Sequence, residues 1–257
     1  MISFIVPAHN EEPLLGKTLA ALRAAAGGVD HEIIVVDDAS TDRTAAIAAA
    51  AGARVVPIER RQISAARNAG AAQARGDLFI FVDADTLISR AVVEEVLSAV
   101  QQGACAGGAP VRMDEPAPAY AKAMLAMLLW AFRHLRLACG CFMFATRRAF
   151  TATTGFDERV YVSEEVGMSR ALGRQGRFVT LRSPVVTSAR KIRTYSFFEI
   201  LGIIAGVTLR GPGVLRDRSR LAFWYGTRRT DPAAGSAATA GPSASDPGSR
   251  TAPGKPS

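Results

Sequence analysis

Short apolar runs alternate with segments of helical character over the first hundred residues of this chain. The apolar runs, which we expect to be strands, cover residues 2–6, 32–36, 54–56 and 78–82. The segments between them, which we expect to be helices, cover residues 11–26, 41–51 and 64–74. Strands that alternate with helices form right-handed crossovers and give a mostly parallel sheet covered on both faces. The sequence therefore predicts an α/β protein with a doubly wound sheet.

The second half of the chain is less regular. We expect strands at residues 103–113, 140–145 and 177–181, and helices at residues 119–135, 164–175, 195–209 and 215–225. From about residue 230 onward the chain is Ala, Gly, Pro, Ser and Thr without periodicity. Such a segment cannot bury enough apolar surface to fold, so we expect a disordered tail.

Charge and cysteine content limit the partners and the compartment. The net charge of +8 is uneven, because residues 190–229 are rich in arginine and only Glu199 and Asp217 oppose them. This asymmetry favours an anionic partner such as a diphosphate or a membrane surface. No nucleic-acid module is recognisable, so we expect no nucleic-acid partner. The three cysteines lack zinc-type spacing, no signal peptide precedes the first apolar run, and no apolar stretch is long enough to span a membrane. These features predict a cytoplasmic protein. Peripheral contact with the inner face of the cell membrane is left open.

Polar side chains follow three of the predicted strands at the points where the strands end. They are His9, Asn10, Glu11, Asp37, Asp38, Asp83 and Asp85. In doubly wound sheets, ligands bind beyond the carboxyl ends of the strands. We therefore expect the functional site at this edge of the sheet.

Asp83 and Asp85 form the strongest local signal for chemistry. Two carboxylates one residue apart at the end of a buried strand can hold a hard divalent cation, with phosphate oxygens completing its shell. Magnesium and manganese suit such oxygen ligands. The alternative is that Asp85 caps a helix that begins near Ser89.

Asp37 and Asp38 offer a second pair of carboxylates at the next strand end. They can accept hydrogen bonds from a base N–H or a ribose hydroxyl, or they can simply form a turn before the following helix. Arg67 lies in the helix before the fourth strand. It can pair with a phosphate, hold the Asp37 and Asp38 carboxylates in place, or lie on a solvated helix face.

Four segments, taken in order, resemble the family-2 glycosyltransferases of the GT-A fold. They are IVPAHNEE at 5–12, VVDDASTD at 35–42, ARNAG at 66–70 and VDAD at 82–85. Any one of these motifs is weak alone, whereas the ordered set is specific. The resemblance covers roughly residues 1–228 and is clearest over the first hundred.

The resemblance implies roles on the donor side. Pro7, Ala8 and Glu11 would line the nucleoside pocket, and Asp38 would contact the base. Asp83 would face the ribose and the donor, and Asp85 would ligate Mg²⁺ or Mn²⁺. It also implies one GT-A domain over residues 1–228, divided into a nucleotide-sugar-binding half at 1–112 and an acceptor-side half at 113–228 that includes a small antiparallel extension of the sheet.

The resemblance also implies roles on the acceptor side. Gly155 and Asp157 belong to a segment similar to the loop beside the acceptor. Glu165 stands where most members have the aspartate that serves as catalytic base. Because Glu165 is one methylene longer, Glu164 remains a rival for this role.

The implied reaction is inverting transfer of a sugar from a UDP or GDP donor to an acceptor hydroxyl. A metal would neutralise the departing diphosphate, and one carboxylate would take the proton from the attacking hydroxyl. The sequence does not identify the acceptor. The alternative is a GT-A-like protein that binds nucleotide or a membrane surface without turnover. A nucleotidyltransferase or a dehydrogenase fits poorly, because no glycine-rich turn follows the first strand.

Overall fold

The computed structural model describes residues 1–114, 127, 130, 132, 134–161 and 163–189 of the 257-residue chain. The strands are β1 Ile2–Ala8, β2 His31–Asp38, β3 Arg54–Ile58, β4 Leu78–Val82, β5 Thr86–Leu87, β6 Ala104–Gly108, β7 Val111–Met113, β8 Phe142–Thr146, β9 Arg177–Thr180 and β10 Val185–Thr187. The helices are α1 Glu12–Ala26, α2 Thr44–Ala50, α3 Ile63–Gln73, α4 Arg90–Gln101, α6 Arg147–Thr151 and α7 Glu164–Gly173.

Seven strands form the main sheet in the order β3-β2-β1-β4-β8-β6-β9. All neighbouring pairs are parallel except the two that involve β8, which runs antiparallel to both β4 and β6. A second sheet has the order β5-β10-β7. The predicted α/β class with a mostly parallel, doubly wound sheet is confirmed.

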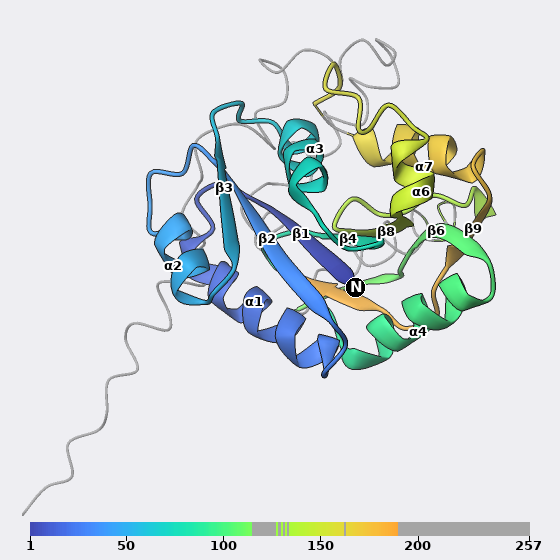
Figure 1. Cartoon of the computed structure of the whole chain (residues 1–257), viewed down its shortest axis with the longest axis horizontal. Coiled ribbons are helices and arrows are strands. Elements are labelled where there is room, and N and C mark those ends of the chain that lie inside the picture. Colours follow the sequence, from blue (N-terminus) through green and yellow to red (C-terminus); the bar gives the residue numbers. More distant parts are fainter. Residues whose placement is uncertain (115–126, 128–129, 131, 133, 162, 190–257) are drawn as a thin grey trace, which may run out of the picture.

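Helices cover both faces of the main sheet, with α1 and α4 on one face and α3, α6 and α7 on the other (Figure 1). Alternation along the central strands explains the two layers. In β1, Phe4 and Val6 join the core that includes Leu15 and Leu19 of α1, whereas Ile5 joins the opposite core. Every residue of β1 and β4 is buried, as the continuous apolar runs predict for strands covered on both sides.

Three predicted boundaries are corrected by tertiary contacts. The second helix begins at Thr44 rather than near Thr41, and the Asp42 carboxylate accepts from the Thr44 N–H. The predicted strand 103–113 is divided at Ala109 and Pro110 into β6 and β7, which belong to different sheets. The strand predicted from residue 140 begins at Phe142, so residues 140 and 141 precede it.

Several predictions fall wholly or largely outside the described residues. They concern the helices at 119–135, 195–209 and 215–225, the arginine-rich segment 190–229 and the tail. The division of the domain at residue 112 stays a prediction, and it falls inside β7. Within the described residues, no helix has the length and apolar character needed to cross a membrane.

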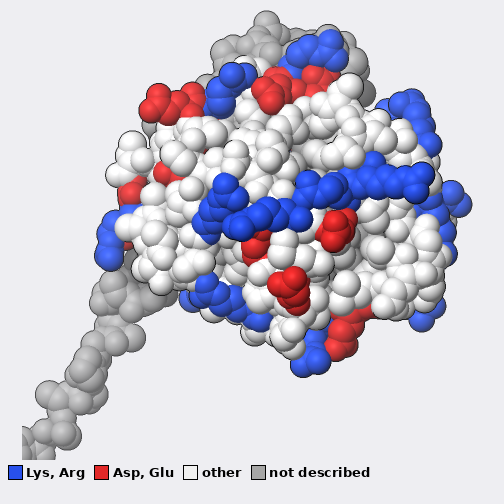
Figure 2. Space-filling model, in the orientation of Figure 1, with Lys and Arg blue, Asp and Glu red and all other residues white. Residues whose placement is uncertain are grey.

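Basic side chains form a band across the face on which β1 begins (Figure 2). At this edge Arg54 bonds Gln73, while Arg147 bonds the carbonyls of Ala74 and Gly76. This edge lies opposite the carboxyl ends of the parallel strands. A concentration of positive charge therefore exists outside the predicted arginine-rich segment and away from the predicted site.

Candidate active site

The structure brings the predicted donor-side residues to one edge of the sheet. Ala8, at the end of β1, pairs in register with Asp37 near the end of β2. Asp83 directly follows the neighbouring β4. Because these strands are parallel, their carboxyl ends meet here, as the sequence predicts.

Two loops at this edge are joined by side-chain hydrogen bonds. Asn10 Oδ1 accepts from the Thr41 N–H at 2.8 Å, and the Asn10 N–H donates to Ser40 Oγ at 3.0 Å. The N–H of Glu11, a buried residue that precedes α1, donates to Thr44 Oγ1 at 2.8 Å. These bonds fix the loop after β1, beside Pro7 and Ala8, against the loop after β2.

Asp38 and Asp37 have different environments. Asp38 is 3% exposed, and its carboxylate accepts from the N–H groups of Arg60, Arg61 and Gln62 at 2.6–2.7 Å. The Asp38 side chain therefore orders the segment between β3 and α3. Asp37 Oδ1 is buried and has no hydrogen-bond partner among the residues that the structure describes. A buried acceptor without a donor is costly. Of these two carboxylates, Asp37 is therefore the one that can accept a hydrogen bond from a ligand.

Arg67 connects the two halves of the site. It is 1% exposed, and its Nη1 donates to Glu164 at 2.5 Å while its Nη2 donates to Asp83 at 2.9 Å. Nη2 also donates to the Gly140 carbonyl, and the guanidinium lies 5.3 Å from the centre of the Phe156 ring. Burial tends to lower the pKa of Arg67, but the charges of Asp83 and Glu164 raise it on balance. Arg67 therefore remains a cation.

The hypotheses that Arg67 holds Asp37 and Asp38 or lies on a solvated helix face are corrected by this geometry. Its ion pairs are with Asp83 and Glu164 instead. The reason is that α3 presents the side chain toward Asp83, just after β4, and toward Glu164 at the start of α7. Arg67 and Glu164 are 97 positions apart, so no local pattern could reveal the pair.

Glu164 and Glu165, the two candidates for the catalytic base, have different surroundings. Burial raises the pKa of Glu164, and the paired Arg67 opposes that rise. Glu165 is half-buried, and an ideal Cβ built at Gly140 would lie 3.4 Å from its carboxyl carbon. Burial first, and then the charge of Glu164, raises the pKa of Glu165 to about 8. No cation of the described chain forms an ion pair with Glu165, so of the two it is the one able to exchange a proton near neutral pH.

Asp83 and Asp85 lie on the other side of this cluster. Asp83 is half-buried, pairs with Arg67 and donates its N–H to the Cys141 carbonyl. Asp85 contacts Thr187 of β10 at 3.4 Å, and its carbonyl accepts from the Ser188 N–H. The alternative that Asp85 caps α4 is wrong, because β5 intervenes and Ser89 is the residue at the helix start.

The carboxylates of Asp83 and Asp85 meet part of the ligand requirement of a divalent cation. Asp83 and Asp85 supply hard carboxylate oxygens, which suit Mg²⁺ or Mn²⁺. Within the described residues there is no group of three side chains that could hold a metal ion. The residues therefore fit a metal only if a bound phosphate supplies further oxygens.

The loop that contains Gly155 and Asp157 is fastened to α3 by Asn68. The Asn68 amide accepts from the Phe156 N–H at 2.8 Å and donates to the Phe156 carbonyl at 2.9 Å. Gly155 has φ +77°, and a Cβ there would lie 2.8 Å from Asn68 Oδ1, so glycine is needed. Asp157 forms an exposed pair with Arg159 at 2.9 Å. The structure therefore places Gly155 against Asn68, the neighbour of Arg67 in α3, whereas Asp157 forms a pair at the surface.

Sequence reasoning missed Asn68, Phe156 and Gly140 as parts of this cluster. The Asn68 amide and Phe156 are 88 positions apart, and Arg67 and Gly140 are 73 positions apart. The adjacency of Asn68 to Arg67 within the ARNAG segment was the one signal available.

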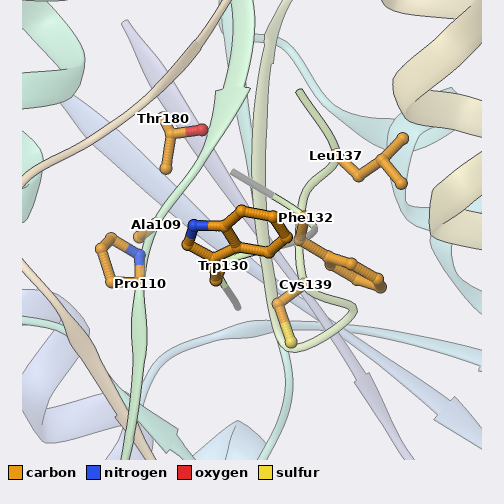
Figure 3. A pocket seen from close by; sticks show the side chains of 7 residues that line it. All are labelled: Ala109, Pro110, Trp130, Phe132, Leu137, Cys139 and Thr180. Carbon is orange, nitrogen blue, oxygen red and sulfur yellow. The ribbon is translucent and has the colours of Figure 1, made fainter. Parts of the chain in front are cut away.

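A pocket of about 240 Å³ has the turn before β8 as part of its wall (Figure 3). Its described lining consists of Ala109, Pro110, Trp130, Phe132, Leu137, Cys139 and Thr180. Cys139 is adjacent in the chain to Gly140, and its charge interaction contributes to the pKa of Glu165. The turn at residues 139–141 therefore connects the pocket wall, at Cys139, with the carboxyl of Glu165, which lies beside Gly140.

Comparison with known proteins gives one family match. Residues 3–152, more than half of the chain, match the model of "Glycosyl transferase family 2". A glucosyl-3-phosphoglycerate synthase of Mycolicibacterium paratuberculosis is 36% identical over 94 residues, which are 34% of this chain and 29% of that protein. A dolichol-phosphate mannosyltransferase of Pyrococcus furiosus is 33% identical over 107 residues, which are 40% of this chain and 30% of that protein. The matched segment thus spans under a third of these relatives.

Solved structures share the fold. TarS of S. aureus, residues 1–349 with UDP-GlcNAc, has a TM-score of 0.61 at 18% identity, covering 82% of this chain and 67% of that one. Glucosyl-3-phosphoglycerate synthase of Mycobacterium tuberculosis, with Mn²⁺, UDP and glucosyl-3-phosphoglycerate, has a TM-score of 0.57 at 20% identity, covering 90% and 81%. At these identities the likeness establishes the GT-A fold.

Proposed function

The chain belongs to glycosyl transferase family 2, and from that membership we propose that it transfers a sugar from a nucleoside-diphosphate sugar to an acceptor hydroxyl. The observation that carries the proposal is the placement of Glu165. Its carboxyl has a pKa of about 8 and lies beside Gly140, whose carbonyl accepts from Arg67 and whose neighbour in the chain, Cys139, lines a pocket.

On the donor side, Pro7, Ala8 and Glu11 line the nucleoside position in this proposal. Asp37 accepts from the base or ribose, because its Oδ1 lacks a partner, while Asp38 acts by ordering residues 60–62. Two structural neighbours hold UDP or UDP-GlcNAc, so uridine donors are the first to test and guanosine donors the second.

Asp85, with Asp83, would hold Mg²⁺ or Mn²⁺, which would neutralise the charge that develops on the departing diphosphate. The other groups position the carboxylates of the site or accept the proton of the acceptor hydroxyl. Arg67 holds Asp83 toward the donor and Glu164 at the start of α7. The acceptor hydroxyl approaches the anomeric carbon from the side opposite the diphosphate, and a carboxylate oxygen of Glu165 takes its proton. A single displacement of this kind inverts the anomeric configuration.

The test is turnover of a panel of UDP- and GDP-sugars with Mg²⁺ or Mn²⁺, measured as release of nucleoside diphosphate. NMR of the transferred sugar would report whether its configuration is inverted. Nucleotide binding without release in the presence of every candidate acceptor would favour a binding protein over an enzyme. No binding of any nucleotide would overturn the proposal.

Asp85→Ala should lower metal-dependent turnover by a factor of about 10²–10³, since charge neutralisation by a metal is worth several kcal/mol. The measurement is the initial rate across a titration of Mn²⁺. Asp77→Ala is the matched control, because this carboxylate is 88% exposed and precedes the same strand at its opposite end. Equal rates for Asp85→Ala and Asp77→Ala would remove Asp85 from the site.

The rate should rise with pH until about pH 8 and then level off. Glu165 with a pKa of about 8 is protonated below that value and cannot accept a proton. We therefore expect kcat/KM for the acceptor to fall about tenfold for each pH unit below the pKa. A profile that stays flat between pH 6 and 9 would contradict Glu165 as the base.

A further inference from the structure

The pocket lined in part by Cys139, the residue before Gly140, is chemically unlike a site for an anion. None of its seven described lining residues is charged. The polar side-chain atoms among them are the Thr180 hydroxyl, the Trp130 indole N–H and the Cys139 thiol. A phosphate or carboxylate placed here would lose its water without gaining a cation. The described lining therefore favours a neutral occupant.

The size of the pocket limits what can enter. Its volume of about 240 Å³ corresponds to roughly eight water molecules at about 30 Å³ each. This is below the usual range for sites that enclose a whole drug-sized ligand, about 300–1,000 Å³. One ring-sized group fits, and the rest of a larger molecule would extend outward.

Two aromatic side chains provide apolar faces for that group. In Figure 3, Trp130 lies across the centre of the pocket with Phe132 beside it, and Thr180, Ala109 and Pro110 lie on the other side. Trp130 is 65% exposed, and its ring is 4.5 Å from that of His134. A large exposed aromatic ring at a pocket is a frequent binding anchor, because it supplies contact area at low entropic cost.

The same segment exposes two further apolar side chains. Met127 and Leu135 are 67% and 64% exposed, although neither lines the pocket. Apolar surface of this kind beside a pocket suits a ligand whose apolar part continues beyond the bound ring. The combination of one ring-sized pocket, aromatic faces and a few hydrogen-bonding groups matches a sugar ring, which has apolar C–H faces and hydroxyls.

Resting on the transferase activity proposed above, we propose that this pocket receives the acceptor and that the acceptor is a neutral glycoside with an apolar aglycone, selected by Trp130. The acceptor hydroxyl then lies toward Gly140 and the carboxyl of Glu165. This class differs from a phosphorylated acceptor, which the names of several relatives would suggest.

Binding is tested on the full chain with octyl β-D-glucopyranoside below its micellar range, methyl β-D-glucopyranoside and 3-phosphoglycerate. The chain has two tryptophans, so a Trp224→Phe variant leaves Trp130 as the one fluorescent indole. We expect saturable changes in its emission with the octyl glycoside, weaker binding of the methyl glycoside and none of 3-phosphoglycerate. Calorimetry on the unmodified protein checks the same order.

Two variants locate the binding. Trp130→Ala should weaken octyl glycoside binding at least tenfold by calorimetry while leaving the Kd for nucleoside diphosphate unchanged. Leu87→Ala, an exposed leucine on β5 that belongs neither to the pocket nor to the segment beside it, should change it less than twofold. Binding of 3-phosphoglycerate in preference to the glycosides, equal effects of the two variants, or no saturable glycoside binding would each overturn the proposal.

The donor measurements separate this inference from the function on which it rests. Nucleotide binding with metal-dependent release, together with failure of every glycoside to bind, would leave the transferase proposal standing and remove the acceptor class. Glycoside binding with no nucleotide binding would remove the transferase proposal and leave the pocket as a glycoside-binding site.

Discussion

Glu165→Gln is expected to lower sugar transfer by a factor of about 10²–10⁴ while the Kd for the nucleoside diphosphate stays within about twofold. Glutamine has nearly the same shape as glutamate but cannot take a proton from the acceptor. Glu165 lies beside Gly140 at the start of α7, whereas the donor-side carboxylates Asp83 and Asp85 follow β4. Single-turnover rates and calorimetry with nucleoside diphosphate measure the two effects separately. Loss of nucleotide affinity with the activity would contradict this role.

The same variant should change how stability depends on pH. The pKa of Glu165 is raised from an ordinary value of 4.5 to about 8 in the folded chain, so between these values the native state binds more protons than the unfolded state. The free energy of unfolding contributed by this group therefore falls as pH rises from 4.5 to 8 and is constant above 8. Glutamine does not titrate, so Glu165→Gln should gain stability relative to the wild type on going from pH 5 to pH 9.

Urea unfolding at pH 5 and pH 9 measures this difference. Glu94→Gln on α4 is the matched control, because the Glu94 side chain is 62% exposed. Its unfolding free energy relative to the wild type should be the same at both pH values. The same result for Glu165→Gln would mean that its carboxyl titrates as an exposed group, which would weaken the case for a base.

Arg67→Met is expected to lower the free energy of unfolding by about 3–5 kcal/mol. Arg67 is almost completely buried, and its removal leaves Glu164 buried without a cation and Asp83 without its partner. Transfer activity should be lost as well, because Arg67 holds the start of α7 against the end of β4. Chemical denaturation at pH 7 measures the first effect, and donor turnover the second.

A double-mutant cycle keeps the test of Arg67 informative if the single variant is too unstable to study. Arg67→Met combined with Glu164→Gln removes the buried charge together with its partner, so the pair should be less destabilised than the sum of the single changes. Arg90→Met is the matched control, since Arg90 and Glu94 form an exposed pair on α4 whose loss should cost less than about 1 kcal/mol. A cost for Arg67→Met as small as that of Arg90→Met would refute the buried network.

The sequence by itself determined the class of fold and the edge that carries the site. Continuous apolar runs at β1 and β4 could be stable only as strands covered on both faces, and the helices between them required a parallel sheet. Asp37 and Asp38 are the last residues of one strand of that sheet and Asp83 and Asp85 follow another, so their meeting at one edge was a consequence of the topology. The spacing of apolar residues along the chain predicts which faces of the strands and helices are buried, and this was sufficient for these conclusions.

Only the tertiary structure decided how the charged groups divide their tasks. Asp37 and Asp38 are adjacent in sequence, yet packing turns Asp38 toward three backbone N–H groups and leaves an oxygen of Asp37 without a donor. In the same way, Arg67 neutralises Glu164 and leaves Glu165 as the carboxyl with a raised pKa. These assignments depend on which side chains meet across 22 to 97 positions of chain, and on the desolvation they undergo there. Neither quantity is contained in the local pattern of residues, because both arise when separate elements pack together.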